Sequence, residues 1–421
     1  MTKTSGRRKP LANSKSAGEK NDSKTAPRRS AEESELFYEA YPNQTWFRSM
    51  RTRALNWFEK NSRDLPWRAK APVTRKNHWL YRVWVSEIML QQTQVQTVVS
   101  YFNRFVKRFP SVQALAEAPE SDVLTLWEGL GYYRRARSLH AAAKKIVAEH
   151  HGKFPDNFED VLALPGVGRY TAGAILSIVL DQRLPILEGN TYRLHARLLG
   201  LICDPRERDA EKALWQFATD LLPGKKSKAR SGQLNQALME LGSEVCTVKN
   251  PNCGQCPLIS LCAAHRLGLE NELPRTKSTT EYEDLHQALF ILEDQKSRAL
   301  VRQREKNEWW SGLWDFVRID VPGTVAIDAS KVTNQSSQLA ELLHQQFGVQ
   351  IHSPIEPSFR LKHAVTKYRI RLDCFHLKQT TWSSNGSYQL MPLAEISELP
   401  LNVTARKAIT RVMGSKGAST S

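Results

Sequence analysis

The chain has 421 residues, a length that typically folds into two or three domains. Apolar residues make up 41% of the chain and charged residues 24%, values that exclude a wholly disordered protein. The formal net charge is +17. This excess of cations favours a polyanionic partner such as a nucleic acid, although a basic surface that serves only solubility would have the same composition.

The amino-terminal segment differs from the rest of the chain. Its first 30 residues hold nine lysines or arginines and two acidic residues, with almost no large apolar side chains. Such a segment cannot bury a core, and we predict that residues 1–45 form a disordered basic tail. The tail could be a targeting peptide, a nonspecific DNA-binding arm or simply a solvated extension. No apolar run is long enough for a membrane span or a secretory signal, so we expect an intracellular protein.

Residues 46–265 have the pattern of an all-α region. Apolar residues recur there at spacings of three and four, and the alternation typical of strands is not evident. The connections are short and contain proline or glycine, as at Phe109-Pro110 and His151-Gly152. The helical pattern is clearest in Ala54–Phe58, Val95–Phe109, Val123–Trp127, Ser138–Val147, Tyr170–Leu180, Thr191–Leu199, Ala213–Leu221 and Leu234–Leu241.

A second domain follows this helical region. Residues 266–282 are polar and are predicted to be a linker. From 283 to 413, β-branched and aromatic runs predict strands, with one helix at Ser337–Gln346 and a short tail at 414–421. The predicted fold is therefore an all-α body followed by a smaller α+β domain. The expected strands lie in His286–Leu292, Arg298–Arg304, Leu313–Ile319 and His363–His376.

Four cysteines lie within 17 residues of one another. Their spacing, C-x6-C-x2-C-x5-C, joins Cys246, Cys253, Cys256 and Cys262. Disulfides are unusual in an intracellular protein, so the group predicts a metal centre. Thiolates suit either zinc or an iron–sulfur cluster, and the general physics of such spacings does not choose between them.

The segment Leu164-Pro165-Gly166-Val167-Gly168 connects two helical patterns. Its two glycines allow a tight turn and a close approach of the backbone to a ligand. The second helix would present free N–H groups at this turn, which suits the binding of one phosphate group. By itself such a string is more often a plain helix connection, but the basic charge and the cysteine group favour the phosphate interpretation.

The hairpin and the cysteine spacing together resemble the helix-hairpin-helix DNA glycosylase superfamily, whose endonuclease III-like members hold a [4Fe–4S] cluster. Within it, the sequence most resembles the adenine DNA glycosylases, which remove adenine mispaired with 8-oxoguanine. The resemblance extends over about residues 52–412 and implies a [4Fe–4S] cluster on the four cysteines. It is carried by RDLPWR at Arg63–Arg68, VWVSEIMLQQTQV at Val83–Val95, WEGLGYYRRAR at Trp127–Arg137, LPGVGRYTAGAI at Leu164–Ile175 and QALMELG at Gln236–Gly242.

Glu87 is the candidate general acid. It belongs to a helical segment rich in apolar residues, so its carboxyl lies either on a helix surface or in an apolar pocket. In a pocket, desolvation would raise its pKa and keep a proton available. The resemblance assigns Glu87 the protonation of adenine, which makes the base a better leaving group.

Base excision also requires extrusion of the nucleotide from the duplex. The resemblance places Gln91, Gln92, Thr93 and Tyr132 where they fill or wedge the duplex, although Tyr132 could also be a core aromatic. The adenine pocket wall is implied to be Arg63, Trp67, Arg68, Leu90 and Glu240, and Arg63 could equally be a structural ion-pair partner.

Two positions decide the type of reaction. Lyases of this superfamily carry a lysine just after the hairpin that forms a Schiff base with the sugar, whereas this chain has Tyr170, which cannot form one. The resemblance therefore implies a monofunctional glycosylase. The aspartate that stabilises the cationic sugar is matched by Glu188, whose reach differs by about 1.5 Å, and Asn190 matches a nearby polar partner. The alternative is that Glu188 only caps the following helix.

The second domain resembles the Nudix-related module of the same family, through the segment Trp309–Phe316. Pyrophosphate hydrolysis would need a glutamate-rich helix that holds magnesium, and residues 337–348 offer only Glu341. We therefore predict a module that recognises the base opposite adenine. Val365, Thr366 and Lys367 match the family loop that contacts 8-oxoguanine; otherwise they belong to an ordinary strand.

The resemblance thus predicts a monofunctional glycosylase that acts as a monomer on double-stranded DNA with an A:8-oxoguanine or A:G mispair, without membrane association. A DNA-lesion binding protein weakened in catalysis by Glu188 is the alternative, and Tyr170 disfavours a bifunctional lyase. The expected compartment is the cytoplasm, associated with the nucleoid, in a bacterium and the nucleus or mitochondrion in a eukaryote.

Overall fold

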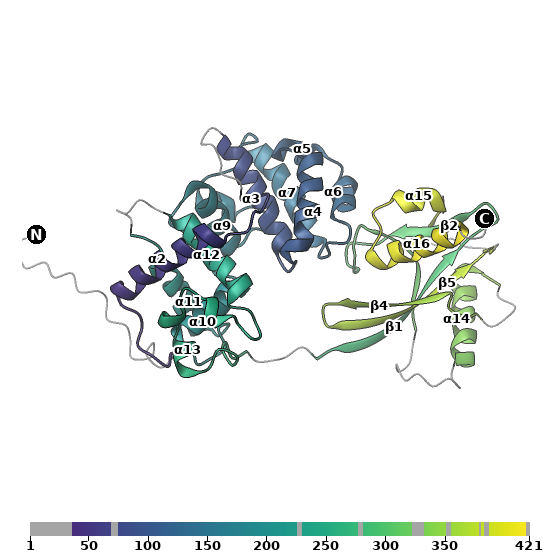
Figure 1. The fold of residues 1–421 in the computed structure, drawn as a ribbon. Coiled ribbons are helices and arrows are strands. Elements are labelled where there is room, and N and C mark those ends of the chain that lie inside the picture. The colour runs from purple at the N-terminus through teal and green to yellow at the C-terminus, as the bar shows by residue number, and fades with distance from the viewer. Residues whose placement is uncertain are drawn as a thin grey trace, which may run out of the picture.

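A helical body precedes a domain built on one β-sheet (Figure 1). The computed structural model describes residues 36–68, 75–224, 230–276, 281–321, 332–350, 355–378, 380–382 and 387–417. The predicted tail as far as residue 35 and the part of the predicted linker at 277–280 lie outside these residues. None of the described helices combines the length and apolar character needed to cross a membrane.

The first hydrophobic core of the helical body is formed by helices that follow one another in the chain. Helix α3 is apolar on nearly all sides and ten of its 15 residues are buried, as expected for a helix surrounded by others. Helix α4 is amphipathic and buries Val98, Phe102 and Phe105 on one face. The elements are α3 (Lys76–Leu90), α4 (Val95–Arg108), α5 (Val112–Glu117), α6 (Glu120–Trp127), α7 (Arg134–Glu149), α8 (Phe158–Leu162) and α9 (Arg169–Leu180).

The second core joins the two ends of the helical region. Helix α2 buries Phe47, Met50 and Ala54 at helical spacing, and the Phe47 ring lies 5.8 Å from that of Phe217. The elements are α2 (Gln44–Asn61), α10 (Gly189–Leu199), α11 (Arg208–Leu221), α12 (Ser231–Glu240) and α13 (Ala263–Leu267), with a π-turn at Leu241–Val245 and 3₁₀ turns at Cys253–Gln255 and Ile259–Leu261.

The folded body extends beyond both boundaries that we predicted for it. Phe37 is buried in the second core, and the Leu36 carbonyl accepts a hydrogen bond from the Ile202 N–H. The tail that we predicted is therefore too long at its C-terminal end. The folded region begins before residue 45, because one aromatic side chain fixes the segment before α2. Leu273, which we assigned to the linker, is also buried, and its carbonyl accepts a hydrogen bond from Arg197.

The second domain is a mixed six-stranded sheet in the order β4-β5-β1-β3-β2-β6. Strands β1 and β5 are parallel, with Leu289 opposite Cys374, and the other neighbours are antiparallel. The predicted strand segment His363–His376 is in fact a hairpin, since β4 ends at Val365 and β5 begins at Tyr368. The strands are β1 (Glu283–Leu292), β2 (Arg298–Gln303), β3 (Trp314–Asp320), β4 (Phe359–Val365), β5 (Tyr368–Leu377) and β6 (Gln389–Pro392).

Helices cover both faces of this sheet. In β1, Leu289 and Ile291 point to the core shared with α15 (Leu393–Glu398) and α16 (Val403–Gly417). Phe290 and Leu292 point to the opposite core, shared with α14 (Val332–Phe347). The second half of the strand is thus buried on both faces, and its sequence from Ala288 to Leu292 is a continuous apolar run. Sequence patterns predicted α14 five residues short at its start and missed β6, α15 and α16.

One loop of the sheet domain packs into the helical body. Leu313, between β2 and β3, is fully buried as part of the first helical core, and Trp310 packs against the same core. The C-terminal domain is therefore attached to the helical body by apolar burial as well as by the linker.

Candidate active site

A cavity of about 360 Å³ opens where the two helical cores meet. Helices α3 and α9 contribute its first wall, and the start of α10 and the face of α12 contribute the other. The cavity brings together most of the residues that the sequence resemblance singled out, from four separate segments. These are Arg63, Trp67, Arg68, Glu87, Leu90, Gln91, Gln92, Thr93, Tyr170, Glu188 and Asn190.

Glu87 lies at the base of this cavity with 3% of its surface exposed. The Tyr170 hydroxyl, from α9, donates a 2.8 Å hydrogen bond to its Oε2. Burial raises the pKa of Glu87 to about 7, the nearby Glu188 carboxylate adds to this rise, and the Tyr170 hydrogen bond opposes it. The carboxyl therefore holds a proton near neutral pH, which is the requirement for a general acid.

Glu240 lies behind the cavity wall instead of lining it. Its carboxylate is fully buried and accepts hydrogen bonds from Arg63 at 2.6 and 3.0 Å, while the Arg68 guanidinium lies 2.6 Å from its Oε2. Burial acts to raise the pKa of Glu240, but the bonds from the two arginines outweigh it and lower the pKa. Glu240 thus stays ionised and fixes both arginines at the cavity wall.

The Glu188 side chain caps α10. Its two carboxylate oxygens accept hydrogen bonds from the backbone N–H groups of Asn190 at 2.9 Å and Thr191 at 3.0 Å, and the Thr191 hydroxyl accepts one from the Glu188 N–H. This is a capping box, so the helix-capping role that we considered from sequence is present. Glu188 nevertheless lines the cavity, and burial raises its pKa.

Gly242 lets the second core approach this cap. A Cβ atom at position 242 would lie 2.8 Å from the Cβ and 2.9 Å from the carbonyl oxygen of Asn190, closer than side chains tolerate. The Asn190 side chain in turn accepts a 3.0 Å hydrogen bond from Arg193. The glycine of the QALMELG motif is thus explained by close packing beside the cavity.

The loop after α3 carries Gln91, Gln92 and Thr93 along the rim of the cavity. Gln92 has a φ of +57°, a left-handed conformation that is uncommon for a residue with a side chain. Tyr132, predicted to act with these residues, lies outside the cavity. Its φ is +49° and 52% of its surface is exposed, which excludes the alternative that it is a core aromatic.

The predicted hairpin connects α8 and α9. Gly166 has a φ of +77°, and a Cβ atom there would lie 2.6 Å from the Cβ of Ser138, so glycine is required. Val167 is buried, whereas Gly168 is the exposed first cap of α9 and has no capping side chain. The N–H groups at the start of α9 are therefore available to an anion such as a DNA phosphate.

The four clustered cysteines line one small cavity in the second core. All are free of disulfides, and the Arg197 guanidinium, which is buried, lies 3.2 Å from the Cys246 Sγ. Burial raises the pKa of Cys256 to about 11 and that of Cys262 to about 12, so these thiols require a bound cation to ionise. Four convergent sulfurs beside a buried arginine fit an anionic thiolate cluster of iron and sulfide.

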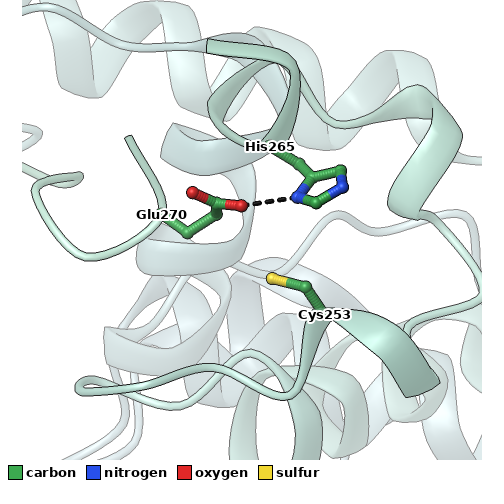
Figure 2. A group of neighbouring side chains, drawn as sticks. All are labelled: Cys253, His265 and Glu270. Atoms are coloured by element: carbon green, nitrogen blue, oxygen red, sulfur yellow. Dashed lines mark hydrogen bonds and ion pairs between the residues drawn. The ribbon is translucent and has the colours of Figure 1, made fainter. Parts of the chain in front are cut away.

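A histidine and a carboxylate lie beside this centre. Figure 2 shows the side chains of His265 and Glu270 next to Cys253, with the His265 Nδ1 2.5 Å from a Glu270 oxygen. Because Cys253 belongs to the four-cysteine set, the three residues do not form a separate metal site. The pair lines the same cavity at its more exposed side.

A second, larger cleft of about 1000 Å³ lies between the helical body and the sheet domain. It is lined on one side by Tyr132 and on the other by Val365 and Thr366, at the tip of the β4–β5 hairpin. Lys367 does not line the cleft, because its ammonium group is paired with Glu283. Of the three residues that match the family loop, Lys367 is thus the one that the structure places outside the cleft, in a surface ion pair with a neighbouring strand.

Sequence reasoning missed several residues of the cavity wall. Gln236 and Met239 come from α12, inside a motif that we quoted but from which we took only Glu240. The other missed residues are apolar or small and carry no chemical signal of their own in the sequence: Leu65, Val83, Val95, Ile178, Gly189 and Ser243.

Models of known families match three parts of the chain. Residues 85–219 match the HhH-GPD superfamily of base excision DNA repair proteins, and residues 288–411 match the NUDIX domain. Residues 246–262, which span the four cysteines, match the iron–sulfur binding domain of endonuclease III. The centre predicted from the cysteine spacing is thus a [4Fe–4S] cluster site.

Relatives of known function extend over a larger part of the chain. The adenine DNA glycosylase of Buchnera aphidicola subsp. Schizaphis graminum is 39% identical over 267 residues, which cover 63% of this chain and 74% of the relative. This chain belongs to the adenine DNA glycosylase family. The rat adenine DNA glycosylase is 44% identical over 220 residues, which cover 52% of this chain and 42% of the longer rat protein.

One solved structure is similar to about half of this chain. A thermostable thymine-DNA glycosylase matches 53% of this chain with 24% identity and a TM-score of 0.46, and the match covers 98% of that structure.

The buried Glu87 carboxyl predicts a pH-dependent stability. Its pKa is about 7 in the folded protein and 4.5 for the ordinary group. The contribution of Glu87 to the free energy of unfolding is therefore largest below pH 4.5 and is lost as the pH rises through 7. Glu87→Gln removes this loss. At 1.36 kcal/mol per pKa unit, we expect its unfolding free energy relative to the parent to increase by about 3 kcal/mol between pH 4.5 and pH 8.

Urea unfolding at both pH values measures this difference. Glu117→Gln, at an exposed position of α5, is the matched control and should show no such change. Equal pH dependence of Glu87→Gln and the parent would show that the Glu87 carboxyl is not desolvated.

Proposed function

We propose that this DNA glycosylase removes adenine from mispairs with 8-oxoguanine or guanine in double-stranded DNA. One observation supports this most directly: a carboxyl with a pKa near 7 lies at the base of a cavity bounded by Trp67, Arg68 and Leu90. Such a cavity suits a flat, flipped-out base, and the protonated carboxyl can supply the proton that adenine needs to leave.

The chemical steps follow from the two carboxyl groups. Glu87 gives its proton to the extruded adenine while the N-glycosidic bond breaks. The electron pair of that bond passes to the base. The sugar becomes cationic at C1′, where the nearby Glu188 carboxylate supplies a compensating negative charge. Water then adds to C1′ and loses a proton to a carboxylate, which leaves an abasic site and free adenine.

Tyr170 supports hydrolysis by water instead of a covalent sugar intermediate. Its hydroxyl bonds to Glu87, and burial raises its pKa well above the ordinary value, so it stays protonated. No lysine lines the cavity among the described residues, so no amine is in place to form a Schiff base with the sugar. The expected product is therefore an intact strand that carries an abasic site.

A duplex with adenine opposite 8-oxoguanine tests this proposal. We expect the parent protein to give strand scission only after alkali treatment, whereas scission without alkali would indicate a lyase. Glu87→Gln should abolish adenine release and retain tight binding of the same duplex, because the amide keeps the shape of the side chain but cannot donate the proton. Substantial adenine release by this variant would contradict the role given to Glu87.

The capping role of Glu188 supports a second candidate function, a lesion-binding protein with weakened catalysis. Both of its carboxylate oxygens already accept backbone hydrogen bonds, which reduces their capacity to stabilise a cationic sugar. Binding of the mispair without scission after alkali would favour this candidate.

Glu188→Asp tests the reach of the carboxylate at position 188. An aspartate is also a good helix cap, so α10 should remain capped. If position 188 stabilises the cation, the single-turnover rate of adenine release should be retained or increased. A loss on the order of 10²-fold would show that the cavity is built around the longer side chain. Thermal unfolding of both proteins serves as the control for folding.

The C-terminal domain is proposed to recognise the base opposite adenine. The β4–β5 tip supports this, because Thr366 is exposed there with a φ of +52° and faces the same cleft as Tyr132. Its hydroxyl now donates to the neighbouring Val365 carbonyl and could exchange this bond for one to the lesion.

Two neighbouring substitutions distinguish base recognition from general DNA binding. Thr366→Ala should lower the ratio of single-turnover rates on 8-oxoguanine:A and G:A duplexes, because the hydroxyl would contact only the oxidised base. Lys367→Ala should weaken binding of both duplexes alike and reduce the salt dependence of binding, because the exposed ammonium group can exchange its surface pair with Glu283 for a DNA phosphate. An unchanged rate ratio for Thr366→Ala would assign recognition of the opposite base to another part of the protein.

A further inference from the structure

A paired charge joins the two domains at the edge of the larger cleft. Arg406, on α16, donates two hydrogen bonds to the Glu128 carboxylate, from Nε at 2.5 Å and from NH2 at 2.9 Å. The same guanidinium donates to the backbone carbonyls of Ser397 and Leu399, which hold it in one orientation. Both partners of the pair are partly buried, so it is less exposed to screening by salt than a surface ion pair.

Glu128 is the first residue of the loop that presents Tyr132. The loop connects α6 to α7, and it contains Gly129 and Gly131, with φ values of +90° and +78°. A loop with this backbone has few intrinsic restraints and depends on side chains to hold it. Figure 1 shows α6 at the side of the helical body that faces α15 and α16.

The helical body holds this loop from the other side. The Tyr101 hydroxyl donates to the Glu128 carbonyl at 2.8 Å, and the Trp127 indole donates to the Gly131 carbonyl at 3.1 Å. Arg135, which is buried, donates to the Leu130 and Gly131 carbonyls. The conformation of the loop is therefore determined by contacts from both domains.

Arg135 also connects this loop to the rim of the active-site cavity. Its NH1 donates to the carbonyls of Ile88 at 3.0 Å, Met89 at 2.9 Å and also Gln91, and its NH2 donates to the Thr93 hydroxyl at 3.1 Å. One buried guanidinium thus joins the Tyr132 loop to the segment that follows Glu87. The contacts run without a break from the C-terminal domain to the cavity.

We propose that the Glu128–Arg406 pair is a positioning contact through which the C-terminal domain sets the Tyr132 loop for extrusion of the target nucleotide. The inference deepens the proposed function and rests on it, since it supposes that Tyr132 acts at the duplex. The pair contacts neither base. The pair fixes the start of the loop, and the hydrogen bonds of Arg135 connect the loop to Gln91 and Thr93.

A charge-swap series tests this inference in the full-length protein. Glu128→Arg and Arg406→Glu each place like charges in contact, and the double variant restores an opposite pair. The two measurements are the single-turnover rate of adenine release from an 8-oxoguanine:A duplex and the fluorescence of 2-aminopurine placed at the target position, which reports extrusion. Arg411→Glu, an exposed position on the same helix that stacks on Phe359, is the matched control for charge.

We expect each single variant to reduce both signals about tenfold, the order of effect of losing a charge-assisted hydrogen bond, and the double variant to return to within about twofold of the parent. The two single changes alter net charge in opposite directions. A simple effect of charge on DNA binding would therefore change the signals of the two single variants in opposite directions, whereas loss of the pair lowers the signals of both variants.

Unchanged 2-aminopurine extrusion in both single variants would overturn the inference. So would a double variant that stays as low as the singles while Arg411→Glu behaves like the parent. Failure of the proposed function is seen separately, as a parent protein that releases no adenine from either the 8-oxoguanine:A or the G:A duplex. The 2-aminopurine signal still measures the effect of the pair on extrusion in that case.

Discussion

The packing of α3 against α9 removes an ionisable group almost completely from solvent. Helix α3 is apolar on nearly all sides, and Glu87 is its one acidic residue, so the helix buries this carboxyl as a consequence of burying its neighbours. Tyr170 comes from 83 residues further along the chain and supplies the hydrogen bond that the buried carboxyl needs. The apolar contacts of the same helix offset the free-energy cost of desolvating Glu87. The desolvated carboxyl then holds a proton near neutral pH.

Features written in a short stretch of sequence were predictable. The four cysteines occupy 17 residues, so their spacing alone identified a metal centre, and the resemblance selected iron–sulfur over zinc. The hairpin at Gly166–Gly168 and the change from helical to strand patterns near residue 283 are equally local. Glu87 and Tyr170 were found because the family motifs contain them, since the residues around them would also suit an ordinary core helix.

Features that depend on the meeting of distant segments were not predictable. Phe37 joins the helical body because its side chain is buried in a core built from distant helices, and Lys367 is paired with Glu283 from a neighbouring strand. The short β6 is formed by pairing with β2, and its own sequence carries little strand signal. The contact between Glu128 and Arg406 spans 278 residues, and neither residue differs in its local sequence from a surface charge.

The second helical core has a consequence for synthesis of the chain. Its first helix, α2, buries Phe47 and Met50 against α11 and α12, and the core is completed only near Cys262. The ribosome makes roughly 200 residues between these points, which takes roughly 10–40 s at about 5–20 residues per second. Apart from Leu313 of the C-terminal domain, the first core is continuous in sequence and can form during that time, whereas the apolar face of α2 must wait. A nascent chain of this enzyme therefore exposes that face to chaperones until its cysteine-rich segment emerges.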